Sequence, residues 1–163
     1  MRGREKAEEC CPRFDPSPWH EKEITWQDKL FVKGTVMQFM HMPLPGTFGR
    51  TVGRIWKQIE DAGASPDIKD FLMLASESSP WKGEIYISAT RDVPNAENVR
   101  LSGTYVTRVF DGPYNAVPKW IKEMDQYAAR KGKSVKNYFF YYTTCPKCAK
   151  SHGHNYVVAF AQV

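Results

Sequence analysis

The chain contains an internal repeat, which constrains its fold more than any other feature of the sequence. The Gly-Thr pair at 34–35 recurs at 103–104, and the run Gly-Glu-Ile-Tyr-Ile at 83–87 recurs as Gly-His-Asn-Tyr-Val at 153–157. The offset between the copies is nearly constant. Two long copies do not make a solenoid, which needs three or more short units, so the pattern indicates one duplicated domain.

Hydrophobic periodicity predicts the same order of elements in each copy. Apolar residues recur at spacings of three and four after Val117, as on one face of a helix, and the Asp-Gly-Pro corner at 111–113 separates this helix from the strand before it. Trp56 and Trp120 occupy corresponding helical positions. Each copy therefore reads strand, helix, strand, strand, with expected ranges 33–44, 47–62, 70–76 and 84–90, then 100–110, 115–131, 136–143 and 155–162.

We expect an α+β fold in which these duplicated strand-helix-strand-strand units, about 32–90 and 100–163, form one antiparallel sheet with both helices on one face. Residues 29–163 would form this single domain. Residues 1–28 would be an N-terminal arm packed on it, because Phe14, Trp19 and Trp26 are costly to leave in water. A groove would run between the repeats, and such seams are common sites for small molecules.

Composition excludes several classes of function. The formal charge is +5, but Lys and Arg are interspersed with acids, which argues against nucleic-acid binding. No apolar run approaches the ~18 residues of a membrane span, and the N-terminus lacks a signal peptide's apolar core, so we expect a cytoplasmic protein without a membrane partner. A monomer or homodimer is expected. The sequence has no nucleophile elbow, phosphate-binding loop or dinucleotide fingerprint, which argues against ordinary esterases, NTPases and dehydrogenases.

Residues 101–114 read Leu-Ser-Gly-Thr-Tyr-Val-Thr-Arg-Val-Phe-Asp-Gly-Pro-Tyr and are followed by Trp120 in a helix and by a C-terminal strand. This pattern resembles the GyrI-like small-molecule-binding domain over about residues 30–163. That family takes in gyrase-inhibitor-type proteins, effector-binding domains of multidrug-sensing regulators and stand-alone hydrolases of cyclopropanoid toxins. This chain departs from the family pattern because it lacks a DNA-binding helix-turn-helix and because its last strand carries no glutamate.

The resemblance implies that an aromatic or heteroaromatic small molecule binds in the groove between the repeats. Two alternatives from other classes follow from it. One is a detoxifying hydrolase of strained-ring compounds, in which a groove carboxylate and tyrosines perform the chemistry. The other is a protein-interaction module of the gyrase-inhibitor type. A desolvated carboxylate in the groove would favour the enzyme, and an all-aromatic groove would favour the binder.

Glu84 is the first candidate for catalysis, because strand alternation places it on one face with Tyr86 and Ser88. Desolvation in a groove would raise the pKa of this carboxyl and suit it to acid–base work near neutrality. A solvated glutamate after a turn is the alternative. The full candidate set is, for catalysis, Glu84, Tyr141 and Glu123, and for ligand binding, Trp56, Tyr86, Tyr105, Trp120, Phe139, His41 and Trp81. The alternative for each ring is core packing, for Glu123 a solvated helix face, and for His41 a hydrogen-bonded residue at a strand edge.

The cysteines occur in two pairs, Cys10-Cys11 in the arm and Cys145-Pro-Lys-Cys148 near the C-terminus. A Cys-Pro-x-Cys turn presents two thiolates on one side, as in structural zinc sites, and the other pair or a nearby histidine would complete the four ligands. Such a site would attach the arm to the last hairpin. Free loop thiols and a redox pair remain alternatives, although redox pairs usually lie at a helix N-terminus, which we do not expect here.

Overall fold

The computed structural model describes residues 14–40, 42–44, 46–79, 81–113, 116–143 and 153–163. The first half contains β1 (Lys22–Phe39), the short β2 (Met42–Pro43), α1 (Thr47–Asp61), the 3₁₀ turn η1 (Ile68–Asp70), β3 (Met73–Ser79) and β4 (Lys82–Ser88). The second half contains β5 (Glu97–Asp111), α2 (Val117–Arg130), β6 (Asn137–Tyr142) and β7 (Tyr156–Gln162). Apart from β2 and η1, each half follows the predicted order of strand, helix, strand, strand.

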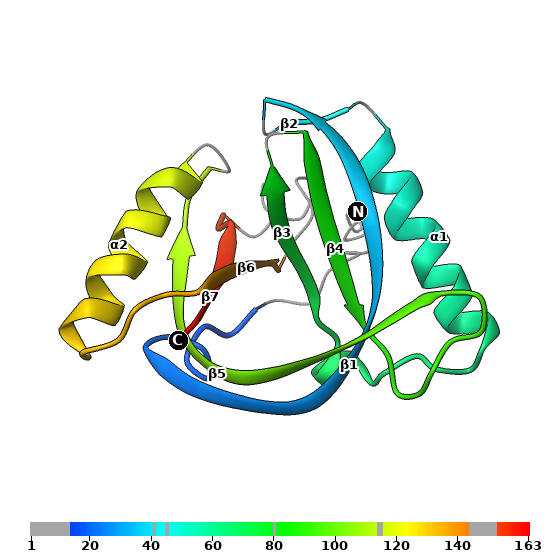
Figure 1. Ribbon diagram of the computed structural model, residues 1–163, viewed down its shortest axis with the longest axis horizontal. Coiled ribbons are helices and arrows are strands. Elements are labelled where there is room, and N and C mark those ends of the chain that lie inside the picture. Colours follow the sequence, from blue (N-terminus) through cyan, green and yellow to red (C-terminus); the bar gives the residue numbers. More distant parts are fainter. Residues whose placement is uncertain (1–13, 41, 45, 80, 114–115, 144–152) are drawn as a thin grey trace, which may run out of the picture.

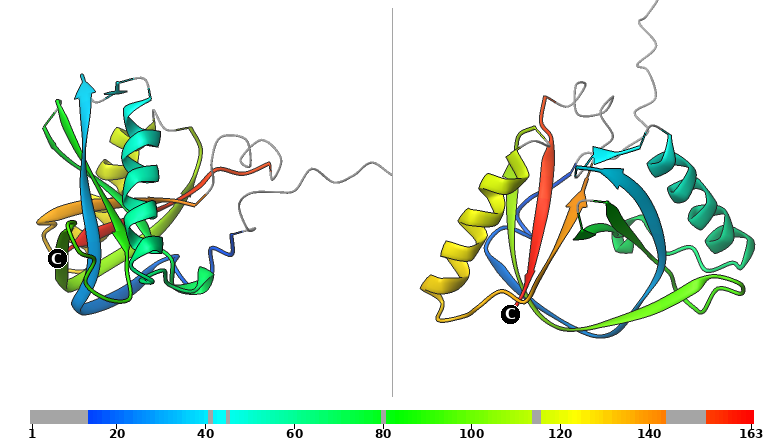
Figure 2. Two further views of the ribbon diagram at one scale, coloured as in Figure 1. Left: turned by 90° about the vertical axis from the view of Figure 1, so that its right-hand side faces the viewer. Right: turned by 45° about the horizontal axis from the view of Figure 1, so that its top comes forward.

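The sheet closes on itself, so the predicted open sheet with both helices on one face is wrong. Neighbouring strands follow the order β1-β4-β3-β6-β7-β5, and β5 pairs antiparallel with β1 to complete a six-stranded barrel, with β2 added at the edge of β1. This last pairing runs from Lys22 opposite Thr107 to Lys33 opposite Glu97, with a bulge between Trp26 and Lys29. Figures 1 and 2 show the closed ring, with the two helices outside it on opposite sides.

The reason for the error is the length of β1. The sequence pattern predicts a strand from Lys33, whereas β1 begins at Lys22 and is long enough to pair with β5 through its first part and with β4 through its second. Phe31 pairs on both sides, with Ser88 of β4 and with Val99 of β5. Residues 22–28 thus form part of the barrel wall.

Strand alternation divides the apolar side chains between the outside and the inside of the barrel. On the outside, α1 packs on β1 and β4 through Ile55 and Ile59, and α2 packs on β5, β6 and β7 through Trp120 and Met124. Inside is a separate and strongly aromatic cluster, whose fully or nearly fully buried members include Phe31, Tyr86, Tyr105, Phe139 and Phe160. No helix in the described residues is both long and apolar enough to cross a membrane.

The segment before β1 packs against this inner cluster. The Trp19 ring lies 5.6 Å from the Phe160 ring, and the Phe14 ring lies 6.3 Å from the Tyr141 ring. The Thr107 hydroxyl donates a hydrogen bond of 2.6 Å to the Trp19 carbonyl, which fixes the segment to β5. Aromatic side chains therefore occupy much of the space in which the sequence predicts a groove.

Replacing Phe160 by Ala tests the inner cluster. Phe160 is fully buried and its ring lies within 6 Å of both Trp19 and Trp26, so the variant leaves a cavity and should lose about 3–5 kcal/mol of unfolding free energy in urea denaturation. Phe39→Ala is the matched control, because 61% of Phe39 is exposed, and this variant should lose no more than about 0.5 kcal/mol of unfolding free energy. Equal losses in the two variants would contradict this description of the core.

Candidate functional site

Glu84 lies near the start of β4 with its side chain on the inner face of the barrel, in line with Tyr86. The Tyr86 hydroxyl donates a hydrogen bond of 2.7 Å to Glu84 Oε2, and Lys33 Nζ lies 3.3 Å from Glu84 Oε1. Lys33 comes from β1, where it is the direct partner of Tyr86. Both charged side chains are mostly enclosed, with 15% of Glu84 and 21% of Lys33 exposed. A carboxylate, a phenol and an ammonium therefore meet on the inside of the barrel.

The environment of Glu84 keeps it ionised. Partial burial alone would raise the pKa of Glu84, but hydrogen bonds from Tyr86 and Lys33 and the positive charges of Lys33 and Lys82 outweigh burial, and the pKa lies below its ordinary value of 4.5. Burial, together with the hydrogen bond to Glu84, raises the pKa of Tyr86 and keeps that phenol protonated. The predicted rise in the pKa of Glu84 is therefore wrong, because Tyr86 and Lys33 donate hydrogen bonds that stabilise the ionised carboxylate.

The remaining catalytic candidates lie apart from Glu84. Tyr141 is on β6, opposite Leu74 of β3, and contacts Phe14 and Trp19 of the N-terminal segment. Glu123 is on α2, which packs on the outside of the barrel, so the wall lies between this residue and Glu84. Glu84 has an aromatic hydroxyl and a lysine as direct partners.

The ligand-binding candidates divide into three groups. Tyr86, Tyr105 and Phe139 belong to the inner cluster, where the Tyr86 and Phe139 rings are 5.4 Å apart. Trp56 and Trp120 pack between the helices and the outside of the barrel, against Phe71 and Phe110 respectively. Both tryptophans therefore have the core-packing role that was the alternative to ligand binding. Trp81 lies in the turn between β3 and β4, and 52% of it is exposed.

His41 and the four cysteines, Cys10, Cys11, Cys145 and Cys148, lie outside the described residues. The zinc site therefore stays a prediction. The described residues contain no group of three or more His, Cys, Asp or Glu side chains that could hold a metal ion.

The sequence reasoning did not identify Lys33, although the signal was present. Lys33 precedes the repeated Gly-Thr pair, and in a strand it shares a face with Phe31 and Thr35. Glu84 lies opposite Thr35 in the β1–β4 register. What the sequence did not supply was this register, which is needed to place a lysine of β1 against a glutamate of β4.

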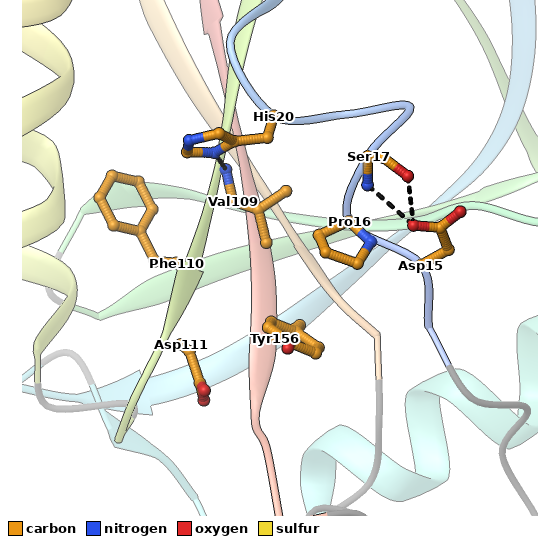
Figure 3. A pocket seen from close by; sticks show the side chains of 8 residues that line it. All are labelled: Asp15, Pro16, Ser17, His20, Val109, Phe110, Asp111 and Tyr156. Atoms are coloured by element: carbon orange, nitrogen blue, oxygen red, sulfur yellow. Dashed lines mark hydrogen bonds between the residues drawn. The ribbon is translucent and has the colours of Figure 1, made fainter.

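In the second half of the molecule, a surface hollow of about 450 Å³ lies beside the segment that corresponds to the Glu84 strand (Figure 3). It is bordered by the N-terminal segment, the end of β5 and the start of β7; its lining residues are Asp15, Pro16, Ser17, His20, Val109, Phe110, Asp111 and Tyr156. In the repeat, Tyr156 corresponds to Tyr86 and His154 to Glu84. His154 stacks on Tyr156, and its Nδ1 lies 2.7 Å from Asp111 Oδ2. Two of these lining residues, Asp111 and Tyr156, belong to the corner and the repeat described above, but none was a candidate site residue.

The model of a family described as Bacterial hydrolase matches residues 1–163, the full length of the chain. The chain belongs to this bacterial hydrolase family. Among curated proteins, none matches it. The resemblance to GyrI-like domains stays an interpretation of the sequence.

Solved structures similar to this bacterial hydrolase family member share its fold at low sequence identity. A hydrolase encoded by lin2189 from Listeria innocua is 10% identical, with a TM-score of 0.62 over 88% of this chain and 92% of the other. A second Listeria innocua hydrolase is 10% identical, with a TM-score of 0.61 over 87% and 90%. A structure of SAV2435 bound to tetraphenylphosphonium is 14% identical over 87% and 92%, and its TM-score of 0.49 is too low to bear on the ligand of this chain.

Tyr86→Phe tests the electrostatics of the Glu84 site. Removing the hydroxyl takes away one of the two hydrogen bonds that lower the pKa of Glu84, so the pKa should rise toward or above its ordinary value. A carbon-detected NMR titration of the Glu84 side-chain carboxyl measures it. An unchanged titration midpoint in Tyr86→Phe would show that the phenol does not stabilise the carboxylate.

Proposed function

We propose that this member of the bacterial hydrolase family hydrolyses an apolar, conjugated small molecule that carries a strained electrophilic ring, and that Glu84 activates the water. One observation carries this proposal: Glu84 is mostly enclosed on the inner face of the barrel, ionised, and held by Tyr86 and Lys33. Family membership supports the reaction type. The aromatic inner cluster favours an apolar, conjugated substrate.

In the proposed reaction, water adds across the strained bond. Glu84 accepts a proton from the water while the water oxygen forms a bond to the electrophilic ring carbon. The bond between that carbon and the conjugated system breaks, and its electron pair moves to the substrate's carbonyl oxygen, which takes up a proton. The Lys33 ammonium stabilises the negative charge that develops on this oxygen.

Tyr86 has a positioning role in this scheme. Its hydroxyl donates to Glu84 Oε2 and so fixes the carboxylate, while the other oxygen faces Lys33. The raised pKa of Tyr86, caused by burial and by the Glu84 carboxylate, keeps that proton in place. Tyr86→Phe should therefore impair orientation of the base more than it impairs binding.

Glu84→Gln should abolish the hydrolysis and leave binding largely intact, because the amide keeps the shape of the side chain but cannot accept the proton. We expect turnover of a spirocyclopropyl-cyclohexadienone, followed by loss of its dienone absorbance, to fall by about 10²–10⁴. Glu60→Gln, the same change at an exposed position on α1, is the control and should retain full turnover. Unchanged turnover in Glu84→Gln would remove Glu84 from the mechanism.

The pH dependence of turnover gives an independent test. The base must be ionised, and the pKa of Glu84 lies below 4.5, so kcat/KM should stay level as the pH falls from neutrality and decline only below that value. Tyr86→Phe should move this decline to higher pH. A decline centred near neutrality in the unmodified protein would indicate a different catalytic base.

A binding protein without catalysis is the second candidate. The hollow beside Asp111 and Tyr156 favours it, because its volume of about 450 Å³ is within the range of small-molecule sites and its lining includes apolar and aromatic side chains. The two functions differ in one result. A pure binder retains its ligand unchanged over time in both the native protein and Glu84→Gln.

A further inference from the structure

The exposed large apolar side chains of the described residues all lie at one end of the molecule. We call this surface the tip patch; it consists of Met37, Phe39, Met40, Leu44, Phe48 and Trp81, each between 37% and 61% exposed. In Figure 1 the end of β1, β2, the start of α1 and the turn between β3 and β4 gather at the top of the molecule. Large exposed apolar patches usually mark a surface that contacts something else.

Backbone hydrogen bonds and a ring contact connect the segments that carry Met37, Phe39, Leu44 and Trp81. The Leu44 amide donates to the Met37 carbonyl at 3.0 Å, and the Gln38 amide donates to the Trp81 carbonyl at 2.9 Å. The Phe39 and Trp81 rings are 5.6 Å apart and meet edge to face. The patch therefore combines a hairpin, a helix start and a neighbouring turn.

The α1 side of the tip patch is positively charged. Residues 34–59, which contain five of its six members, include no Asp or Glu, but they include Arg50 and Arg54; Lys57, further along α1, pairs with Asp61 at 3.0 Å. Arg50 Nε donates to the Gly46 carbonyl at 3.1 Å, which holds the guanidinium at the start of α1 beside the patch. Arg54 is exposed one turn further along. The helix N-terminus adds its own partial positive charge.

We infer that the tip patch docks on an anionic lipid bilayer, with its apolar side chains at the interface and its arginines at the headgroups. Exposed Trp, Phe, Met and Leu beside arginines form a combination that favours interfacial binding. A second copy of the chain fits less well, because it would bring the arginines of two tip patches, Arg50 and Arg54 in each, into one contact. This inference goes beyond the proposed hydrolysis and does not depend on it. It departs from the sequence-based expectation that the protein has no membrane partner.

Docking of this kind would also bring the Glu84 site toward the bilayer. Trp81 lies in the β3–β4 turn, three residues before Glu84 of β4. Met37 and Phe39 share a strand face with Lys33, because side chains alternate along β1. Apolar substrates concentrate in membranes. The tip patch would therefore place Glu84 close to such substrates.

Vesicle co-sedimentation tests the inference. We expect the protein to bind vesicles that contain phosphatidylglycerol, to bind pure phosphatidylcholine vesicles much less, and to lose binding as salt rises. The double variant Phe39→Ser with Trp81→Ser should weaken binding at least about tenfold, because it removes two aromatic side chains from the interface. Arg50→Gln should weaken it about fivefold, which corresponds to about 1 kcal/mol per basic residue at an anionic surface.

Arg130→Gln is the control, because Arg130 is exposed in the last turn of α2, and this end of α2 lies away from the tip patch in Figure 1; the variant should bind as the unmodified protein does. Circular dichroism and thermal midpoints confirm folding of every variant. The inference is overturned if the folded protein ignores anionic vesicles, or if the tip variants bind as tightly as Arg130→Gln. A vesicle-independent dimer that Phe39→Ser dissolves would also overturn it, and would assign the tip patch to a second copy of the chain.

Discussion

The pairing of β1 with β5 determines the rest of this structure. It joins the two repeats at their first strands, closes the sheet into a barrel and separates its surface into an outside, covered by two helices, and an inside. A long β1 with a bulge between Trp26 and Lys29 makes this possible, because a bulge lets a strand bend. Without the closure, Lys33 would not pair with Glu97, nor Trp26 lie 4.7 Å from Tyr105.

Closure of the barrel also explains the environment of the Glu84 carboxylate. Glu84 is placed on the inner face, where burial makes its charge costly, and the fold offsets that cost with Tyr86 and Lys33. Because the pKa of Glu84 is lowered, the ionised form adds stability above pH 4.5, and this contribution is lost as the pH falls through the lower pKa in the folded protein. The ion pair of Glu84 with Lys33 on the inner face is the basis of the proposed hydrolysis.

Much of the secondary structure could be predicted from the sequence because it depends on local patterns. The stripe from Val117 to Tyr127 marks α2, and the repeat marks its counterpart α1. The closure could not be predicted, because residues 22–28 lie before the repeat and among polar and charged neighbours, and their partners on β5 are distant in the chain. Among the site residues, Glu84 and Tyr86 follow from alternation alone. Lys33 and the hollow beside Asp111 require the strand register and the path of the N-terminal segment.

The central claim is that reaction occurs at Glu84 rather than at the equivalent place in the second repeat. Backbone NMR of the protein with the ring-opened alcohol product of a spirocyclopropyl-cyclohexadienone tests it most directly. We predict the largest chemical-shift changes at the amides of Lys33, Glu84 and Tyr86. Changes confined to Val109, Asp111 and Tyr156, with the Glu84 strand unaffected, would contradict it and place the ligand in the hollow.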